Sequence, residues 1–90
     1  MKKAILTVLG RDKVGIVYRI SEKCKALDLN ILDINQTIMD DFFTMVIMID
    51  YSSAEGKFEV ISEEFNKLGI EMGLQMKLQS EDHFNTIFTV

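Results

Sequence analysis

The amino-acid sequence predicts an α+β domain in which a four-stranded antiparallel sheet carries two helices on one face. Short apolar runs of strand length alternate with segments of helical periodicity, in the order strand, helix, strand, strand, helix, strand. Each of the two helical segments has a single apolar stripe, which favours packing both on the same side of the sheet. We expect residues 1–90 to form one domain, because a chain of this length builds only one modest core.

The composition narrows the classes of function. The formal charge is −4 and no basic cluster is longer than Lys2-Lys3, so nucleic acid is not an expected partner, because phosphate binding requires clustered lysine and arginine. No apolar run reaches the roughly 18 residues that span a bilayer, and the first apolar run is shorter than a signal-peptide core. The sequence therefore predicts a cytoplasmic protein with no membrane partner.

The first strand is expected over Ala4 to Leu9 and the first helix from about Val14 to Asp28. The turn between them places the unpaired N–H groups of a helix start beside an acidic residue and a glycine, a geometry that can hold a carboxylate or phosphate. The single cysteine lies on the helix stripe, where a buried structural thiol is the expected role. That stripe consists of Val17, Ile20, Cys24 and Leu27.

A second strand is expected from Asn30 to Asp40, because the apolar period changes to two. Asp40-Asp41 then forms a tight turn, and the run from Phe42 to Asp50 is apolar on both sides, as in a central strand. The alternation of the second strand places Leu32, Ile34, Gln36 and Ile38 on one side and Ile31, Asp33, Asn35, Thr37 and Met39 on the other.

The second helix is expected to start after Ser52 and Glu55, which have capping-box spacing, and to end at Gly69. Its stripe consists of Phe58, Ile61, Phe65 and Leu68. A half-exposed edge strand follows over 71–79. A short C-terminal helical segment over 81–90 carries Phe84, Ile87 and Phe88 on one side.

This order of elements is the ferredoxin-like βαββαβ plan, whose right-handed crossovers place the first and third strands in the middle of the sheet. The face of those strands away from the helices is too apolar to lie in water. We predict that this face is a homodimer interface or is covered by the C-terminal segment. Its apolar residues are Ile5, Leu9, Phe42, Val46 and Met48.

The turn over 10–17, followed by Ser21, Leu27 and Asn30-Ile31, resembles the ACT-domain pattern, in which an aspartate, a nearby glycine and a later Asn-Ile recur. The whole chain is similar to small stand-alone bacterial and archaeal ACT proteins, including their hairpin with Gln36-Thr37 through Asp40, Phe43-Thr44-Met45 and Asp50. The resemblance implies a non-enzymatic module that binds an amino acid between two domains and transmits this to an enzyme or transcriptional regulator. The chain departs from many amino-acid-binding members at Val14, where they have proline.

Two interpretations of the turn remain open. In the functional one, Asp12 caps the helix, Gly15 allows a ligand to approach, N–H groups near Val14, Gly15 and Ile16 bind its carboxylate, and Asn30 holds its other end. In the structural one, Asp12 is an ordinary N-cap, Gly15 allows close packing of helix and sheet, and Asn30 closes the first helix.

Two other functions compete with an amino-acid sensor. The first is a pure protein-interaction or dimerisation module without a ligand. The second is an acylphosphatase-like hydrolase using Arg19 and Asn35, although the turn is one residue longer than that family's phosphate loop and its Asn-x-x-Asp-Gly pattern is missing. With His83 the only histidine and Cys24 the only cysteine, we expect neither a metal cluster nor a cofactor. The regulated protein cannot be read from the chain.

Overall fold

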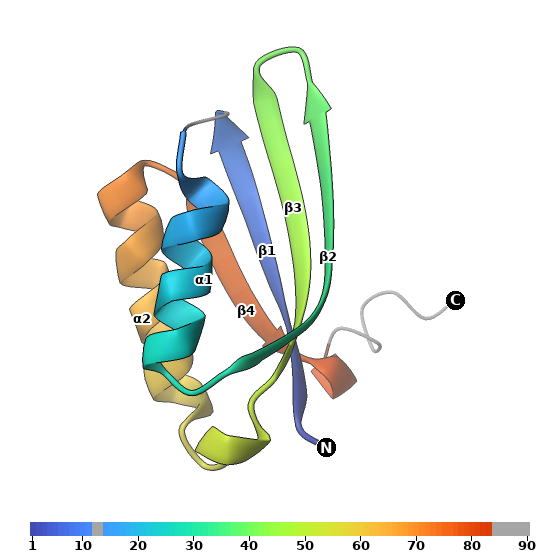
Figure 1. Cartoon of the computed structure of the whole chain (residues 1–90), viewed down its shortest axis with the longest axis vertical. Coiled ribbons are helices and arrows are strands. Elements are labelled where there is room, and N and C mark those ends of the chain that lie inside the picture. Colours follow the sequence, from blue (N-terminus) through green and yellow to red (C-terminus); the bar gives the residue numbers. More distant parts are fainter. Residues whose placement is uncertain (12–13, 84–90) are drawn as a thin grey trace.

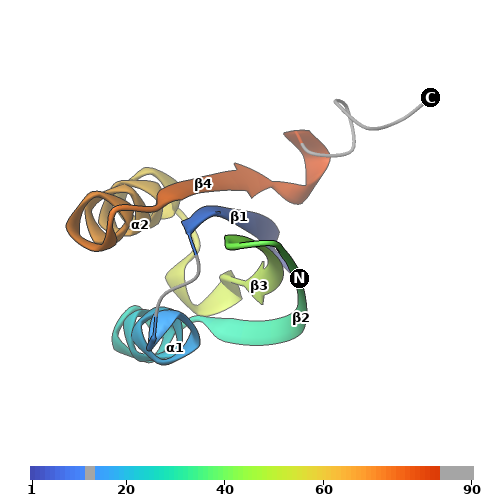
Figure 2. The same cartoon turned by 90° about the horizontal axis from the view of Figure 1, so that it is seen from above.

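The computed structural model, which describes residues 1–11 and 14–83, confirms the predicted order of elements (Figure 1). Helices α1 (Ile16–Ala26) and α2 (Phe58–Met72) lie on one face of a four-stranded antiparallel sheet, and a short 3₁₀ helix, η1 (Ser52–Ala54), precedes α2 (Figure 2). The strands are β1 (Lys3–Arg11), β2 (Asn30–Met39), β3 (Phe42–Asp50) and β4 (Gln75–Ser80). Their order in the sheet is β2-β3-β1-β4, so the first and third strands are central as predicted.

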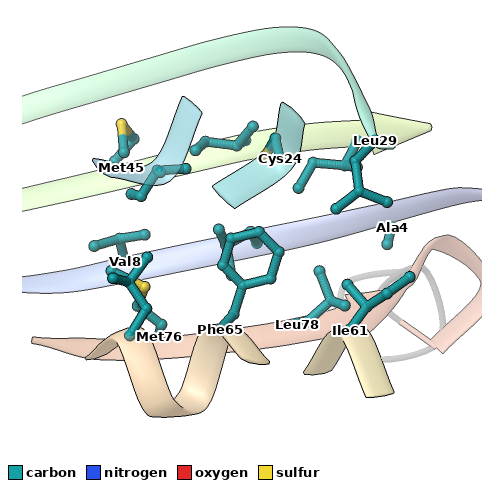
Figure 3. Close-up of a cluster of buried hydrophobic side chains, with 14 of the residues drawn as sticks. Ala4, Val8, Cys24, Leu29, Met45, Ile61, Phe65, Met76 and Leu78 are labelled. Carbon is teal, nitrogen blue, oxygen red and sulfur yellow. The ribbon is translucent and has the colours of Figure 1, made fainter. Parts of the chain in front are cut away.

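The hydrophobic core lies between the sheet and the two helices (Figure 3). Leu6 and Val8 of β1 have no exposed surface, and the fully buried Phe65 ring points from α2 toward the sheet. Cys24 of α1 is 2% exposed, which confirms a buried thiol. The core confirms the stripe predicted for the second helix, because Ile61, Phe65 and Leu68 are all buried.

Helix α1 starts later than the sequence pattern indicated. Gly15 occupies the N-cap with a left-handed φ of 86°, so the residues before it cannot continue the helix. The buried stripe is Ile16, Ile20 and Cys24, whereas Val17 is 40% exposed; the prediction was wrong by one position at its first member. Leu27 packs partly buried against the core, just beyond the end of α1 at Ala26.

Strand β2 contains a bulge that the alternation could not reveal. Its pairing with β3 shifts between Ile31, which faces Ile49, and Asp33, which faces Met48. The extra residue, Leu32, moves Ile31 to the same side of the sheet as Ile34. The predicted grouping of Ile31 with Asp33 was therefore wrong.

Helix α2 continues past its predicted end at Gly69 to Met72, and Gly73, with φ 71°, is the C-cap. The last strand accordingly covers Gln75–Ser80 instead of 71–79, and it lies at the sheet edge as predicted. Gly69 is buried inside the helix, and a Cβ built there would lie 2.8 Å from the carbonyl oxygen of Leu74. A glycine is needed at position 69 because α2 and the start of β4 approach each other closely at this point.

The predicted capping box at the start of the second helix was wrong, because Lys57 is the N-cap of α2. Ser52 instead ties the chain start to the end of β3: its Oγ accepts the Lys2 backbone N–H at 2.9 Å. The Ser52 hydroxyl and backbone N–H donate to Oδ1 of Asp50 at 2.5 and 2.9 Å. These hydrogen bonds hold the pKa of the Asp50 carboxyl below its usual value.

The sheet face away from the helices, called the open face below, carries all five residues predicted for it. Ile5 at its lower end is 5% exposed and Met48 is half-buried, whereas Leu9 and Phe42 at its upper end are 44% and 54% exposed. A helical turn begins over residues 81–83 on this side of the sheet (Figure 2). The positions predicted for Phe84, Ile87 and Phe88 lie outside the described residues. The use of this face as an interface stays a prediction.

We expect Gly69→Ala to destabilise the fold by about 1 to 3 kcal/mol, because the new Cβ meets a backbone carbonyl that cannot move aside. The control is Asn66→Ala on the exposed side of the same helix, where alanine's higher helix propensity should stabilise by about 0.5 kcal/mol. Urea unfolding of both variants measures the difference. Equal stabilisation by the two alanines would show that the approach of α2 to β4 is not tight.

The lowered pKa of Asp50 makes a pH-dependent contribution to stability. A depressed folded-state pKa stabilises the fold above the unfolded-state pKa of about 3.9, and this contribution is lost as the pH falls through the folded-state value. Asp50→Asn should therefore lose less stability than the wild type between about pH 7 and about pH 3 in urea unfolding. Asn66→Ala, at an exposed site on α2 that carries no ionisable group, is the control and should keep the wild-type pH slope.

Candidate functional site

Three chain reversals meet at the upper end of the molecule in Figure 1: the link from β1 to α1, the turn from β2 to β3, and the turn from α2 to β4. The pairing of Arg11 with Phe42 and of Leu9 with Gln75 brings the strand ends of all three together. Loops at one end of a rigid sheet are common positions for binding residues. The candidate site therefore consists of residues at this end of the sheet.

The β1–α1 link presents a helix start to solvent. Val14 is fully exposed, whereas Ile16 is 2% exposed and belongs to the core. The first bond of α1 runs from the Arg19 backbone N–H to the Gly15 carbonyl at 2.9 Å, so the amides before Arg19 in the first turn have no acceptor within the helix. Amides of this kind at the start of a helix are able to bind an anion.

Gly15 is required for its backbone angle and not for space. A Cβ built there meets no described atom within 4 Å, the sheet included, so the structural interpretation that this glycine permits close helix-to-sheet packing was wrong. Gly15 occupies the N-cap position of α1, whereas Asp12, predicted as the cap, lies outside the described residues.

Asn30 lies at the opposite end of the sheet from the turn. It pairs with Asp50 at the end of β3, whereas the turn adjoins Arg11, which pairs with Phe42 at the start of β3. The two rows are eight residue steps apart along β3, about 26 Å at 3.3 Å per residue. Within one chain, Asn30 and the turn therefore do not contact one small ligand, contrary to the expected contact across the turn. Asn30 also does not close the first helix, because it is the first residue of β2.

The structure reveals a groove on the open face that sequence reasoning missed. It has a volume of about 390 Å³ and a largely apolar lining. At its rim the Arg11 guanidinium donates to the Asp41 carboxylate and lies 5.7 Å from the centre of the Phe42 ring. Arg11 and Asp41 are 30 positions apart, so their pairing could have been predicted only from the register of the strands. The lining residues are Leu9, Gly10, Arg11, Phe42, Gly73 and Gln75.

The residues proposed for phosphoryl chemistry are not assembled. Arg19 of α1 donates to Glu71 of α2 at 2.6 Å, and this carboxylate raises the pKa of the guanidinium above its usual value. Asn35 pairs with Val46 and lies on the open face of the sheet, in a different layer. The two side chains therefore cannot act on one phosphoryl group.

The described residues offer little support for other chemistries. Burial raises the pKa of the Cys24 thiol to about 11, so it is protonated and unreactive at neutral pH. Over 1–11 and 14–83, no three His, Cys, Asp or Glu side chains gather as a metal site would require. In the same part of the chain, every helix is too short or too polar to cross a bilayer.

The model of the ACT domain family matches residues 2–79. A UPF0237 protein of Clostridium acetobutylicum is 41% identical over 85 residues, which cover 94% of this chain and 96% of that protein. One from Methanocaldococcus jannaschii is 42% identical over 84 residues, covering 93% of each. The structure also superposes on an ACT domain protein from Streptococcus pneumoniae with a TM-score of 0.80 at 38% identity, covering 99% of this chain and 96% of that one. With nearly its full length matched in sequence and fold, this chain belongs to the ACT domain family and to its UPF0237 group.

Proposed function

We propose that this chain is a cytoplasmic regulatory sensor, in which two copies associate along β2 and bind an amino acid or small carboxylate between them. ACT domains are regulatory modules, and the described residues of the candidate site supply backbone anion donors, while Arg19 and Asn35 lie in different layers. The ligand's carboxylate would bind the amides near Val14, Gly15 and Ile16. Asn30 of the second copy would hold its other end.

The observation that carries this proposal is the separation of Asn30 from the turn within one chain. Two identical strands related by a two-fold axis pair antiparallel, so the start of one lies beside the end of the other. If β2 pairs over its whole length, Asn30 of the second copy lies beside Met39, at the turn end of the first copy. Each dimer would then contain two equivalent sites built from both copies.

Strand β2 has the features of an interface edge. It is ten residues long, lies at the sheet edge, and contains no lysine or proline to block pairing with another strand. Its exposed apolar side chains are Leu32 and Ile34 at 38%, Ile38 at 58% and Met39 at 75%. Such a surface is unfavourable in a monomer. It also favours the second candidate function, a dimerisation module with no ligand.

The dimer is tested with Ile34→Lys, which adds a charge at the centre of the free edge. We expect this variant to sediment as a monomer at concentrations where the wild type is a dimer. Val60→Lys on α2, also at an exposed aliphatic residue, is the matched control and should remain a dimer. A dimer that survives Ile34→Lys but is lost in Leu9→Lys would place the interface on the open face instead.

Ligand binding is tested by thermal unfolding in the presence of each amino acid. A ligand at 100 times its dissociation constant stabilises by about 2.7 kcal/mol. We expect stabilisation by at least one amino acid in the wild type, and its loss in Asn30→Ala and in the monomeric Ile34→Lys. Asn66→Ala, remote from the turn on α2, should keep the response. A response from no amino acid would favour the dimerisation module without a ligand.

A further inference from the structure

The groove beside Arg11 is separate from the turn site. Leu9, Arg11, Phe42 and Gln75 share the open face by register, whereas α1 lies against the opposite face. We propose that this groove is a second binding site, for an α-amino acid with an apolar side chain. It takes the ligand class of the proposed function but requires neither the turn amides nor a second copy.

The ion pair at the rim matches the two charges of an amino acid. A guanidinium carries five N–H donors, and the contact with Asp41 uses its Nη1, so the fork can also bind a carboxylate in bidentate fashion. The Asp41 carboxylate beside it accepts hydrogen bonds from an ammonium group. The two side chains are 69% and 53% exposed, so a ligand reaches both without unfolding the turn.

The Phe42 ring and Leu9 form an apolar floor below this charged pair. Both are about half exposed, which is unusual for side chains of this kind on a central strand. The groove volume of about 390 Å³ is at the lower end of the range for small-molecule sites and suits a ligand of amino-acid size. Burying an apolar ligand side chain there would remove both surfaces from water.

The surrounding charge disfavours ligands that carry more than one negative charge. Asp40 adjoins Asp41 in the same turn, and the whole chain has a formal charge of −4. A dianion such as a phosphate or a dicarboxylate would therefore meet net repulsion beyond the single guanidinium. A zwitterion with an apolar side chain satisfies both members of the pair and the groove floor.

The proposal is tested by isothermal titration of the full chain with L-leucine and with two analogues, 4-methylpentanoate without the amine and 3-methylbutylamine without the carboxylate. We expect L-leucine to bind the wild type and each analogue to bind at least about tenfold more weakly. Arg11→Gln and Asp41→Asn should each weaken L-leucine binding by at least about tenfold. Arg19→Gln, which breaks the exposed ion pair on the helix layer instead, should leave the affinity unchanged.

A second variant, Leu9→Trp, fills the groove without touching the ion pair. The chain has no other tryptophan, so its fluorescence also reports on the folded open face. L-leucine binding should be lost in this variant while its unfolding transition is kept. Retained affinity in Leu9→Trp or in Arg11→Gln would overturn the groove site, as would a wild-type dimer that becomes monomeric in Leu9→Trp, since a second copy would then occupy this face.

The results separate this proposal from the proposed function. L-leucine binding that is lost in Asn30→Ala and kept in Arg11→Gln supports the turn site and overturns the groove site. Binding that is lost in Arg11→Gln and kept in Asn30→Ala and in the Ile34→Lys monomer supports the groove and overturns the site between copies. No heat from L-leucine with the wild type overturns the groove site, whatever other amino acids bind at the turn.

Discussion

The pairing of β1 with both β3 and β4 is the constraint on which the rest of the structure depends. Because side chains alternate along a strand, the register that sets Leu6 against Ile47 and Leu78 fixes which residues of three strands enter the core. A shift of β1 by one residue would turn Thr7 into the core and Val8 to the open face. The same register sets Leu9 beside Gln75 and Arg11 beside Phe42, so the core and the open-face groove follow from one set of hydrogen bonds.

The fold could be predicted because its signals are local and repeated, while the element ends depend on contacts distant in sequence. The stripe through Ile61, Phe65 and Leu68 indicates a helix without any tertiary knowledge. From the sequence, either of two glycines near its end could terminate the helix. In the structure Gly69 packs against Leu74 within the helix, and Gly73, with its positive φ, ends it. The sequence similarly gives no sign of the bulge at Leu32, because side chains are expected to alternate between the two faces both before and after it.

The residues of the candidate site also fall into those that the local sequence predicts and those whose positions depend on contacts distant in sequence. The turn around Gly15 could be predicted because a glycine between a strand and a helix often adopts a left-handed backbone angle, as Gly15 does. The position of Asn30 could not be derived in this manner: its closeness in sequence to α1 suggests a neighbour of the turn, but an eleven-residue helix carries it to the far end of the sheet. The Arg11–Asp41 pair was missed for the converse reason, because the two residues are distant in sequence and the sheet brings them together.

The two candidate sites are separate but lie close together along the chain. Arg11 closes the open-face groove, and only four residues separate it from Ile16, whose buried side chain anchors the start of α1. If both proposed sites are occupied, the ligand at the Arg11 guanidinium and the carboxylate at the start of α1 would each hold one end of this short segment. Coupling of this kind is reciprocal by linkage, so each ligand would alter the affinity for the other by the same factor. The short link is what would make a small ACT domain able to respond to two molecules at once.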